Sequence, residues 1–265
     1  FIISVTGCIY VFEDELKSFF YKNKIYIDVP ENGIKMPVSE LTKIAQKALG
    51  KNNSIQLIEI STDANRSYLF KPAIIKNPLA YTYFSEFEYY RIVYINPYTG
   101  KIIKNENAKY EFFNIILFLH RSLLLNKNIG NIVVGISVLI FVIMLLTGIV
   151  LWWPKNKTAI KQRLSFRWKK NTRWRRKNYD FHNILGFYGF FFALIIALTG
   201  LTWSFDWFDN SVQYLVNGGV VKKIKPLFSD ISRSTSTSLS IDHLFNETVK
   251  QNPNAKLFSI NIPKE

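Results

Sequence analysis

The stretch from Asn131 to Trp153, NIVVGISVLIFVIMLLTGIVLWW, decides the class of this protein because it contains no charged residue over 23 positions. As an α-helix it rises about 34 Å, which is enough to cross the ~30 Å hydrocarbon core of a bilayer. A second uncharged stretch of the same length runs from Asn183 to Phe205. A helix in the core of a soluble protein is the alternative, but two such stretches in one chain disfavour it. We therefore predict transmembrane helices over 131–153 and 183–205.

The segment that joins the two predicted helices, residues 154–182, is strongly basic. From Lys155 to Lys177 it holds eleven lysines and arginines and no acidic residue. Short loops of this kind stay in the cytoplasm, which predicts the bacterial inner membrane as the location and places the other polar segments in the periplasm. Apolar residues alternate with these cations, so the loop either lies on anionic lipid or is a solvated topology signal. The net charge of +15 therefore points to the lipid bilayer and not to nucleic acid.

Two shorter apolar stretches precede the first long one. Residues 1–12 rise only about 18 Å as a helix, so we predict the end of a truncated first transmembrane helix. Residues 112–125 suit an interfacial helix on the outer side better than a span. A Thr-Gly pair recurs in three apolar stretches, which we interpret as helix packing. The pairs are Thr6-Gly7, Thr147-Gly148 and Thr199-Gly200.

The polar segment 13–111 combines the pattern of one helix with those of several strands. Apolar residues recur at helical spacing over 39–49, with Ser39 as the candidate cap and Gly50 just after the end. Strand-like runs follow, with a turn signal at 96–100 before the last of them. They cover Ile55–Ile60, Ser67–Phe70, Tyr81–Phe84, Phe87–Ile95 and Lys101–Ile103. We predict an α+β domain in which a helix packs on a small antiparallel sheet.

Residues 209–265 repeat this order of elements. A helical pattern over 240–249 is followed by a strand pattern over 256–262. The sequence ends before such a domain could close. We therefore predict the truncated start of a second domain of the same kind.

Several kinds of site are disfavoured by the residues present. The single cysteine, Cys8, cannot form a disulfide framework or a cysteine-based metal site within this chain. No nucleotide-binding motif, Ser/His/Asp group or pair of carboxylates stands out, so we name no catalytic side chain. A permease is also disfavoured, because apart from the two histidines the spans contain no charged group that would mark a substrate or ion path.

Short motifs in three segments resemble the PepSY-associated transmembrane proteins. They are Leu119–Leu125, Leu146–Pro154 and Asp180–Tyr188, while Asn96–Lys101 is similar to the closing hairpin of a PepSY domain. The resemblance implies an α-helical transmembrane bundle that carries periplasmic α+β PepSY-like domains. It also implies further helices, one beginning upstream of residue 1 and one after a second PepSY-like domain.

The same resemblance implies two alternative functions. Some family members are haem-containing inner-membrane reductases that pass electrons to ferric siderophores in the periplasm. This alternative implies one or two haem b groups, and a cytoplasmic or quinol electron donor. The other alternative is a non-enzymatic PepSY membrane protein that binds or modulates a partner such as a protease.

The candidate site residues are two of the three histidines and one arginine. His120 lies in the segment 112–125 and His182 lies beside the basic loop, and neutral imidazole is a usual haem ligand. The predicted topology puts them near opposite faces of the membrane, so they would bind two different irons, each with a partner outside this chain. Arg121 would pair with a haem propionate or with lipid phosphate. The alternative is that both histidines are interfacial and structural, and we assign no function to His243.

Overall fold

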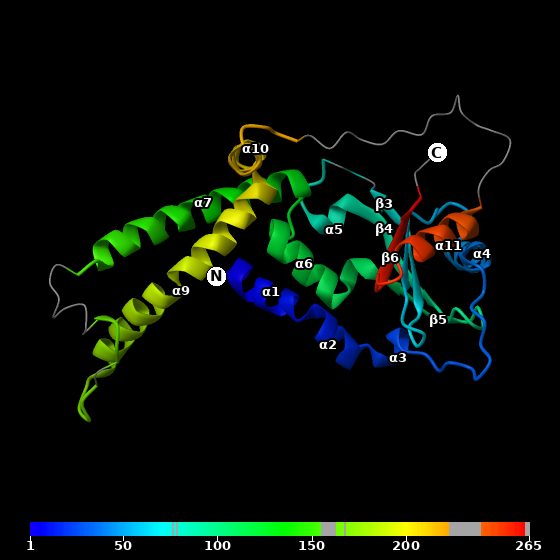
Figure 1. Cartoon of the computed structure of the whole chain (residues 1–265), viewed down its shortest axis with the longest axis horizontal. Coiled ribbons are helices and arrows are strands. Elements are labelled where there is room, and N and C mark those ends of the chain that lie inside the picture. Colours follow the sequence, from blue (N-terminus) through cyan, green and yellow to red (C-terminus); the bar gives the residue numbers. More distant parts are fainter. Residues whose placement is uncertain (76, 78, 155–162, 167, 223–239, 263–265) are drawn as a thin grey trace. The chain divides into compact units, whose positions relative to one another are not determined.

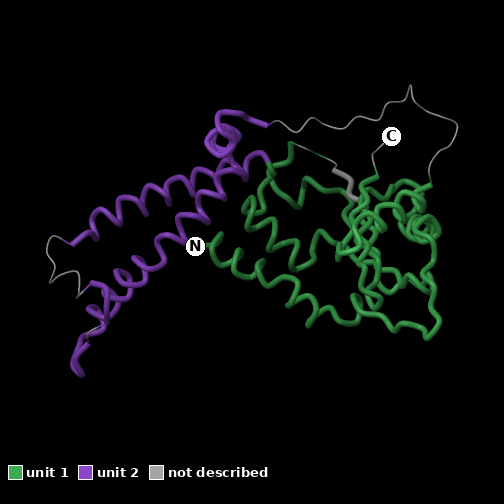
Figure 2. Tube along the Cα trace, in the orientation of Figure 1, with its two compact units in different colours: residues 1–127, 226–265 green, residues 128–225 purple. Residues whose placement is uncertain are grey.

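The computed structural model describes the chain in two compact units, which are considered separately (Figures 1 and 2). Unit 1 comprises residues 1–127 and 226–265, and unit 2 comprises residues 128–225. The described residues are 1–75, 77, 79–154, 163–166, 168–222 and 240–262. Unit 1 contains the sheet, and unit 2 contains the long apolar helices.

Unit 1 is built on an antiparallel sheet of six strands in the order β3-β4-β2-β1-β6, with β5 also paired to β4. Ile58 of β1 lies opposite Phe70 of β2, which lies opposite Val93 of β4, so these apolar side chains share one face. The strands are β1 (Leu57–Ser61), β2 (Tyr68–Lys71), β3 (Ala73–Ile75), β4 (Phe87–Ile95), β5 (Ile102–Asn107) and β6 (Leu257–Asn261). Five of the predicted strands are confirmed, Phe87–Ile95 with its predicted ends and the others with shifted ends, and β3 was not predicted.

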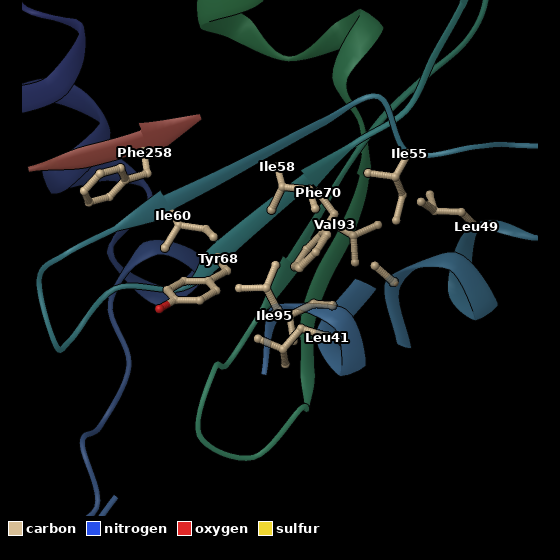
Figure 3. Packing of buried hydrophobic residues seen from close by; sticks show 12 residues of the cluster. Leu41, Leu49, Ile55, Ile58, Ile60, Tyr68, Phe70, Val93, Ile95 and Phe258 are labelled. Atoms are coloured by element: carbon tan, nitrogen blue, oxygen red, sulfur yellow. The ribbon is translucent and has the colours of Figure 1, made fainter. Parts of the chain in front are cut away.

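Helix α4 (Val38–Leu49) packs on this face of the sheet and closes the core of unit 1 (Figure 3). Leu41 and Leu49, which are spaced by about two turns, are buried against Ile58 and Phe70. Each large apolar side chain buried in this way stabilises the fold by about 1.5–3 kcal/mol. Gly50 ends the helix with φ 87°, a conformation that favours glycine. The predicted helix and its packing on an antiparallel sheet are confirmed.

The elements predicted in the last part of the chain join the same sheet. Helix α11 (Ile241–Gln251) lies beside α4, and β6 pairs with β1 from Leu57–Asn261 to Ser61–Leu257. These residues therefore extend the sheet of unit 1 and do not start a second sheet. The prediction that Ser39 caps α4 is wrong, because the helix begins at Val38 and Ser39 lies inside its first turn. There the Ser39 backbone N–H donates to Asp242 Oδ1 at 3.0 Å. A second PepSY-like domain stays a prediction.

The prediction of a strand over Tyr81–Phe84 is wrong, because this segment leads into the short helix α5 (Tyr83–Glu86). The Thr82 hydroxyl accepts a hydrogen bond from the Ser85 N–H at 3.3 Å and caps the helix. The Tyr83 ring is fully buried, with its centroid 4.2 Å from that of Phe118. The local preference of threonine and aromatic residues for strands is thus overridden by the cap and by tertiary packing.

The remaining helices of unit 1 include the two shorter apolar stretches. Helix α1 packs on α6, and both predicted stretches are confirmed as helices. Helical structure also continues through α2 and α3, beyond the predicted border at residue 13. These elements are α1 (Ile2–Val11), α2 (Glu13–Phe20), α3 (Lys22–Ile25), the 3-10 helix η1 (Ala108–Tyr110) and α6 (Phe112–Ser122).

Unit 2 contains α7 (Lys127–Trp152), α9 (Trp174–Ser204) and α10 (Asp206–Val216). Helices α7 and α9 are antiparallel, since Trp152 stacks on Phe187 at one end while Gly135 faces Phe205 near the other. Both helices are long and apolar enough to cross a membrane, and only 17% and 22% of their most apolar windows are buried. A core helix of a soluble protein would be mostly buried, so the exposed apolar surface is available to lipid. Because α9 begins at Trp174, part of the predicted basic loop is helical.

Candidate functional site

Helix α6 carries His120 and Arg121 in its last turn, and its first turn is fixed by a carboxylate. The Glu111 side chain accepts hydrogen bonds from two backbone N–H groups of that turn at 2.8 and 3.1 Å, which satisfies donors that the helix leaves open. The Tyr21 hydroxyl donates to the same carboxylate at 2.7 Å. Burial, together with the hydrogen bond and the charge of Glu111, raises the pKa of Tyr21. The tyrosine therefore stays protonated and keeps donating.

The other end of α6 is held in an unusual backbone conformation. Leu123 and Leu124 have φ values of 54° and 57°, and the left-handed region costs such residues about 1–2 kcal/mol each. The Leu124 carbonyl accepts a hydrogen bond from the Tyr83 N–H at 2.9 Å, so α5 supports this turn. Strained turns persist only where the surrounding structure fixes them. His120 therefore sits on a helix that is anchored at both ends.

The half-buried His120 ring is oriented by helix α1. Its Nδ1 lies 2.9 Å from the Ile3 carbonyl oxygen and 3.3 Å from the Thr6 hydroxyl. The Thr6 hydroxyl lies 2.8 Å from the Ile2 carbonyl and donates to it. Because a carbonyl oxygen can only accept, Nδ1 of the neutral ring donates to Ile3 and Nε2 keeps its lone pair. This is the form of imidazole that binds haem iron, with a carbonyl fixing the orientation of the ring.

Close contact between α1 and α6 depends on a glycine. A Cβ on Gly7 would lie 2.9 Å from Cε1 of His120, which is too close for two carbon atoms. The packing interpretation of the Thr6-Gly7 pair is therefore confirmed. A Cβ on Gly148 or Gly200 would meet nothing within 4 Å among the described residues. The other two pairs thus face open space in unit 2.

His182 lies on α9 in unit 2, and its side chain is exposed. One turn later the backbone is open at Gly186, where a Cβ would meet nothing within 4 Å among the described residues. Arg121 in unit 1 is exposed as well. No group of three or more His, Cys, Asp and Glu side chains within the described ranges could hold a metal ion. Each histidine is therefore a single donor, which fits an axial ligand and not a multidentate metal site.

The comparison with known families decides what this chain is. The family model described as the PepSY-associated TM region matches residues 1–256. The chain belongs to this family. The predicted resemblance is thus confirmed, and with its two candidate spans this PepSY-associated TM protein is a membrane protein. A search among curated proteins found no match.

Sequence reasoning located the histidines of this PepSY-associated TM protein by residue type, but it missed what orients one of them. The Ile3 group is a backbone carbonyl, which every residue has, so no sequence signal marks it. Glu111 could have been found, because a residue with a side-chain acceptor directly before an apolar helical run is a candidate N-cap. The anchoring of α6 depends on both ends of the helix, and only its first end carries such a signal.

Proposed function

We propose that this PepSY-associated TM protein transfers electrons across the bacterial inner membrane by way of haem b and reduces ferric siderophores in the periplasm. The His120 ring carries the proposal, because the Ile3 carbonyl holds Nδ1–H and leaves Nε2 as a donor to iron. In this proposal the basic loop 154–182 lies in the cytoplasm, as the positive charge of the loop predicts, and unit 1 lies in the periplasm.

The residues around His120 fit an axial ligand and its surroundings. When bound, haem supplies a one-electron Fe(III)/Fe(II) couple whose potential depends on the axial ligand and the local dielectric. The hydrogen bond to Ile3 fixes the plane of the imidazole and increases the basicity of Nε2. Arg121 is exposed one residue further along α6 and would pair with a propionate.

His182 would serve a second haem at the predicted cytoplasmic end of α9. Its ring is exposed, and no atom of the described part of the chain lies within 4 Å of where a Cβ on Gly186 would be, so a flat ligand has space close to the helix. An electron from a cytoplasmic or quinol donor would enter on this side. Each histidine would hold the iron of its own haem in this proposal.

The test is an absorption spectrum of the full chain, purified in detergent after expression with haem supplied, before and after reduction with dithionite. We expect a Soret band that sharpens and shifts on reduction. His120→Ala and His182→Ala should each lose part of this band, whereas His243→Ala should keep all of it. His243 is a matched control because it is the third histidine of the chain and lies exposed on α11. A colourless protein, or equal losses in all three variants, contradicts the proposal.

A second candidate function is binding of a protein partner without electron transfer, for example binding or modulation of a protease. The observation that favours it is the position of β6, which is the last strand in the pairing order of the described sheet. The outer edge of such a strand presents backbone N–H and C=O groups to which an extended peptide can pair. A haem-free protein that binds extended peptides, and loses them when a proline replaces Ser259 in β6, would support this function instead.

A further inference from the structure

Residues 163–166, which precede α9 in the sequence, lie alongside that helix. The Arg163 guanidinium donates to the backbone carbonyl of Trp152 at the end of α7. One residue later, the Leu164 carbonyl accepts a hydrogen bond from the Tyr188 hydroxyl at 3.1 Å. Tyr188 lies inside the uncharged stretch that starts at residue 183, about 8 Å further along the helix. Leu164 is therefore level with the beginning of the predicted span.

Three aromatic rings form a cluster directly beside this contact. Phe166, Trp168 and Phe181 are mutually in contact, with ring centroids 5.0–5.1 Å apart, and all three remain exposed. The Trp168 indole N–H donates to Asp180 Oδ2 at 3.1 Å, and Asp180 also pairs with Arg176 at 3.1 Å. Asp180 is the only acidic residue between positions 155 and 182. Its charge is thus compensated inside the cluster, and residues 155–182 contain no second carboxylate to oppose the exposed cations around the cluster.

The length of α9 places this cluster at the depth of the lipid headgroups. Its 31 residues rise about 46 Å, compared with a hydrocarbon core of ~30 Å and a bilayer of ~40–45 Å including the headgroup regions. The uncharged stretch 183–205 fills the core, so the first two turns, from Trp174 to Asp180, extend through the headgroup region. Exposed aromatic rings and long cationic side chains are both favoured at this depth.

We propose that this surface binds anionic phospholipid headgroups of the predicted cytoplasmic leaflet. The surface consists of Phe166, Trp168 and Phe181 with the exposed cations Lys169, Lys170 and Arg173, and we call it the basic aromatic surface. The rings rest in the interface while the cations reach the lipid phosphates. Each cation close to an anionic leaflet contributes about fivefold to the binding constant. The inference depends on the membrane placement of α9 and not on haem.

The test uses the full chain with Cys8 replaced by serine, so that a fluorescent bimane can be attached to a single introduced cysteine. One sample carries the label at Asn171, within the exposed basic segment, and the other at Asn210 on α10, at the opposite end of unit 2. Both are reconstituted into vesicles of 3:1 phosphatidylcholine and phosphatidylglycerol. In one set of vesicles the phosphatidylcholine carries a nitroxide on its acyl chain, and in a second set the phosphatidylglycerol carries the same nitroxide. We expect the nitroxide on phosphatidylglycerol to quench the label at 171 several-fold more, and both lipids to quench the label at 210 equally.

Charge variants distinguish binding of anionic lipid by the basic aromatic surface from a general attraction between a positively charged protein and the membrane. In the triple variant Lys169→Gln/Lys170→Gln/Arg173→Gln, the nitroxide on phosphatidylglycerol should no longer quench the label at 171 more than the nitroxide on phosphatidylcholine. The affinity for the anionic lipid should fall by about fivefold for each cation removed. The matched triple variant Lys43→Gln/Lys47→Gln/Lys256→Gln changes the net charge equally through exposed lysines of unit 1 and should keep the preference. Equal quenching by both lipids in the wild type overturns the proposal. So does a preference that survives in the first triple variant or disappears in the second.

Discussion

Replacing Gly7 by alanine should displace the His120 ring. The added Cβ would lie 2.9 Å from Cε1 and 3.4 Å from Nδ1 of the imidazole. Since non-bonded carbon atoms pack at about 3.5–4.0 Å, the ring or helix α1 has to move by roughly 0.6 Å. A shift of this size along the 2.9 Å hydrogen bond from Nδ1 to the Ile3 carbonyl would lengthen it to about 3.5 Å, beyond the ~2.7–3.2 Å range of N–H···O bonds.

The expected loss of stability follows from three terms. Overpacking costs about 1–3 kcal/mol, and the lost hydrogen bond costs about 1 kcal/mol. Alanine in place of glycine inside a helix offsets up to about 1 kcal/mol. We therefore expect the free energy of unfolding of Gly7→Ala to fall by about 1–4 kcal/mol.

The assay is thermal unfolding of the full chain in detergent, with Gly148→Ala as the matched control. Gly148 belongs to the same Thr-Gly repeat, but a Cβ there meets nothing within 4 Å among the described residues. The control should be as stable as the wild type or slightly more stable. Equal stability of both variants would refute the close packing of α1 on α6. A Gly7→Ala variant that unfolds earlier, but shows the same haem absorption as the wild type, would contradict the proposed role of His120 as a haem ligand.

Three further predictions concern unit 1. Burial raises the pKa of Glu86, and this effect exceeds the lowering by the backbone N–H and the charge of Lys127. The protonated carboxyl therefore stabilises the folded state. This stabilisation is fully present below about pH 4 and is lost as the pH rises through the raised pKa. Glu86→Gln should therefore increase the unfolding free energy at pH 7 and flatten its pH dependence, as measured by denaturation at pH 4–7. Gly100→Ala should cost about 1–2 kcal/mol in thermal unfolding, because φ is 68° and the Cβ would lie 2.8 Å from Ile44 Cδ1. Phe258→Ala should cost about 3 kcal/mol and accelerate hydrogen exchange of β1 amides about 100-fold, since Phe258 of β6 is buried in the core; unchanged exchange would contradict the placement of β6.

Local patterns were enough to predict the elements whose partners lie nearby in the sequence. The two long helices follow from uncharged length, and the β4–β5 hairpin follows from the turn at 96–100. The pairing of β6 with β1 could not be predicted, because about 200 residues separate the two strands and many strand partners fit the same alternating pattern. The strand predicted at Tyr81–Phe84 failed for a related reason. Tyr83 is buried by contacts with Phe118, far along the chain, which no local pattern contains.

The candidate site shows the same division between residue type and geometry. His120 and His182 could be proposed from the sequence because an ionisable side chain in or beside an apolar stretch is rare. The tautomer of His120 depends on the Ile3 carbonyl, and the approach of that carbonyl depends on Gly7. The Thr6-Gly7 pair indicated close packing but could not identify the partner. An apolar run therefore predicts a helix, but the residues that contact this helix are known only from the folded structure.

The anchoring of α6 has a consequence for how electrons would be delivered. The helix is fixed at its first turn by Glu111 and at its last by the Leu123–Leu124 turn, and Phe118 between them packs on Tyr83. His120 therefore belongs to the same compact unit as the sheet, and not to the pair of long apolar helices. If the sheet holds the iron complex, the distance from His120 to that complex is set within unit 1 alone.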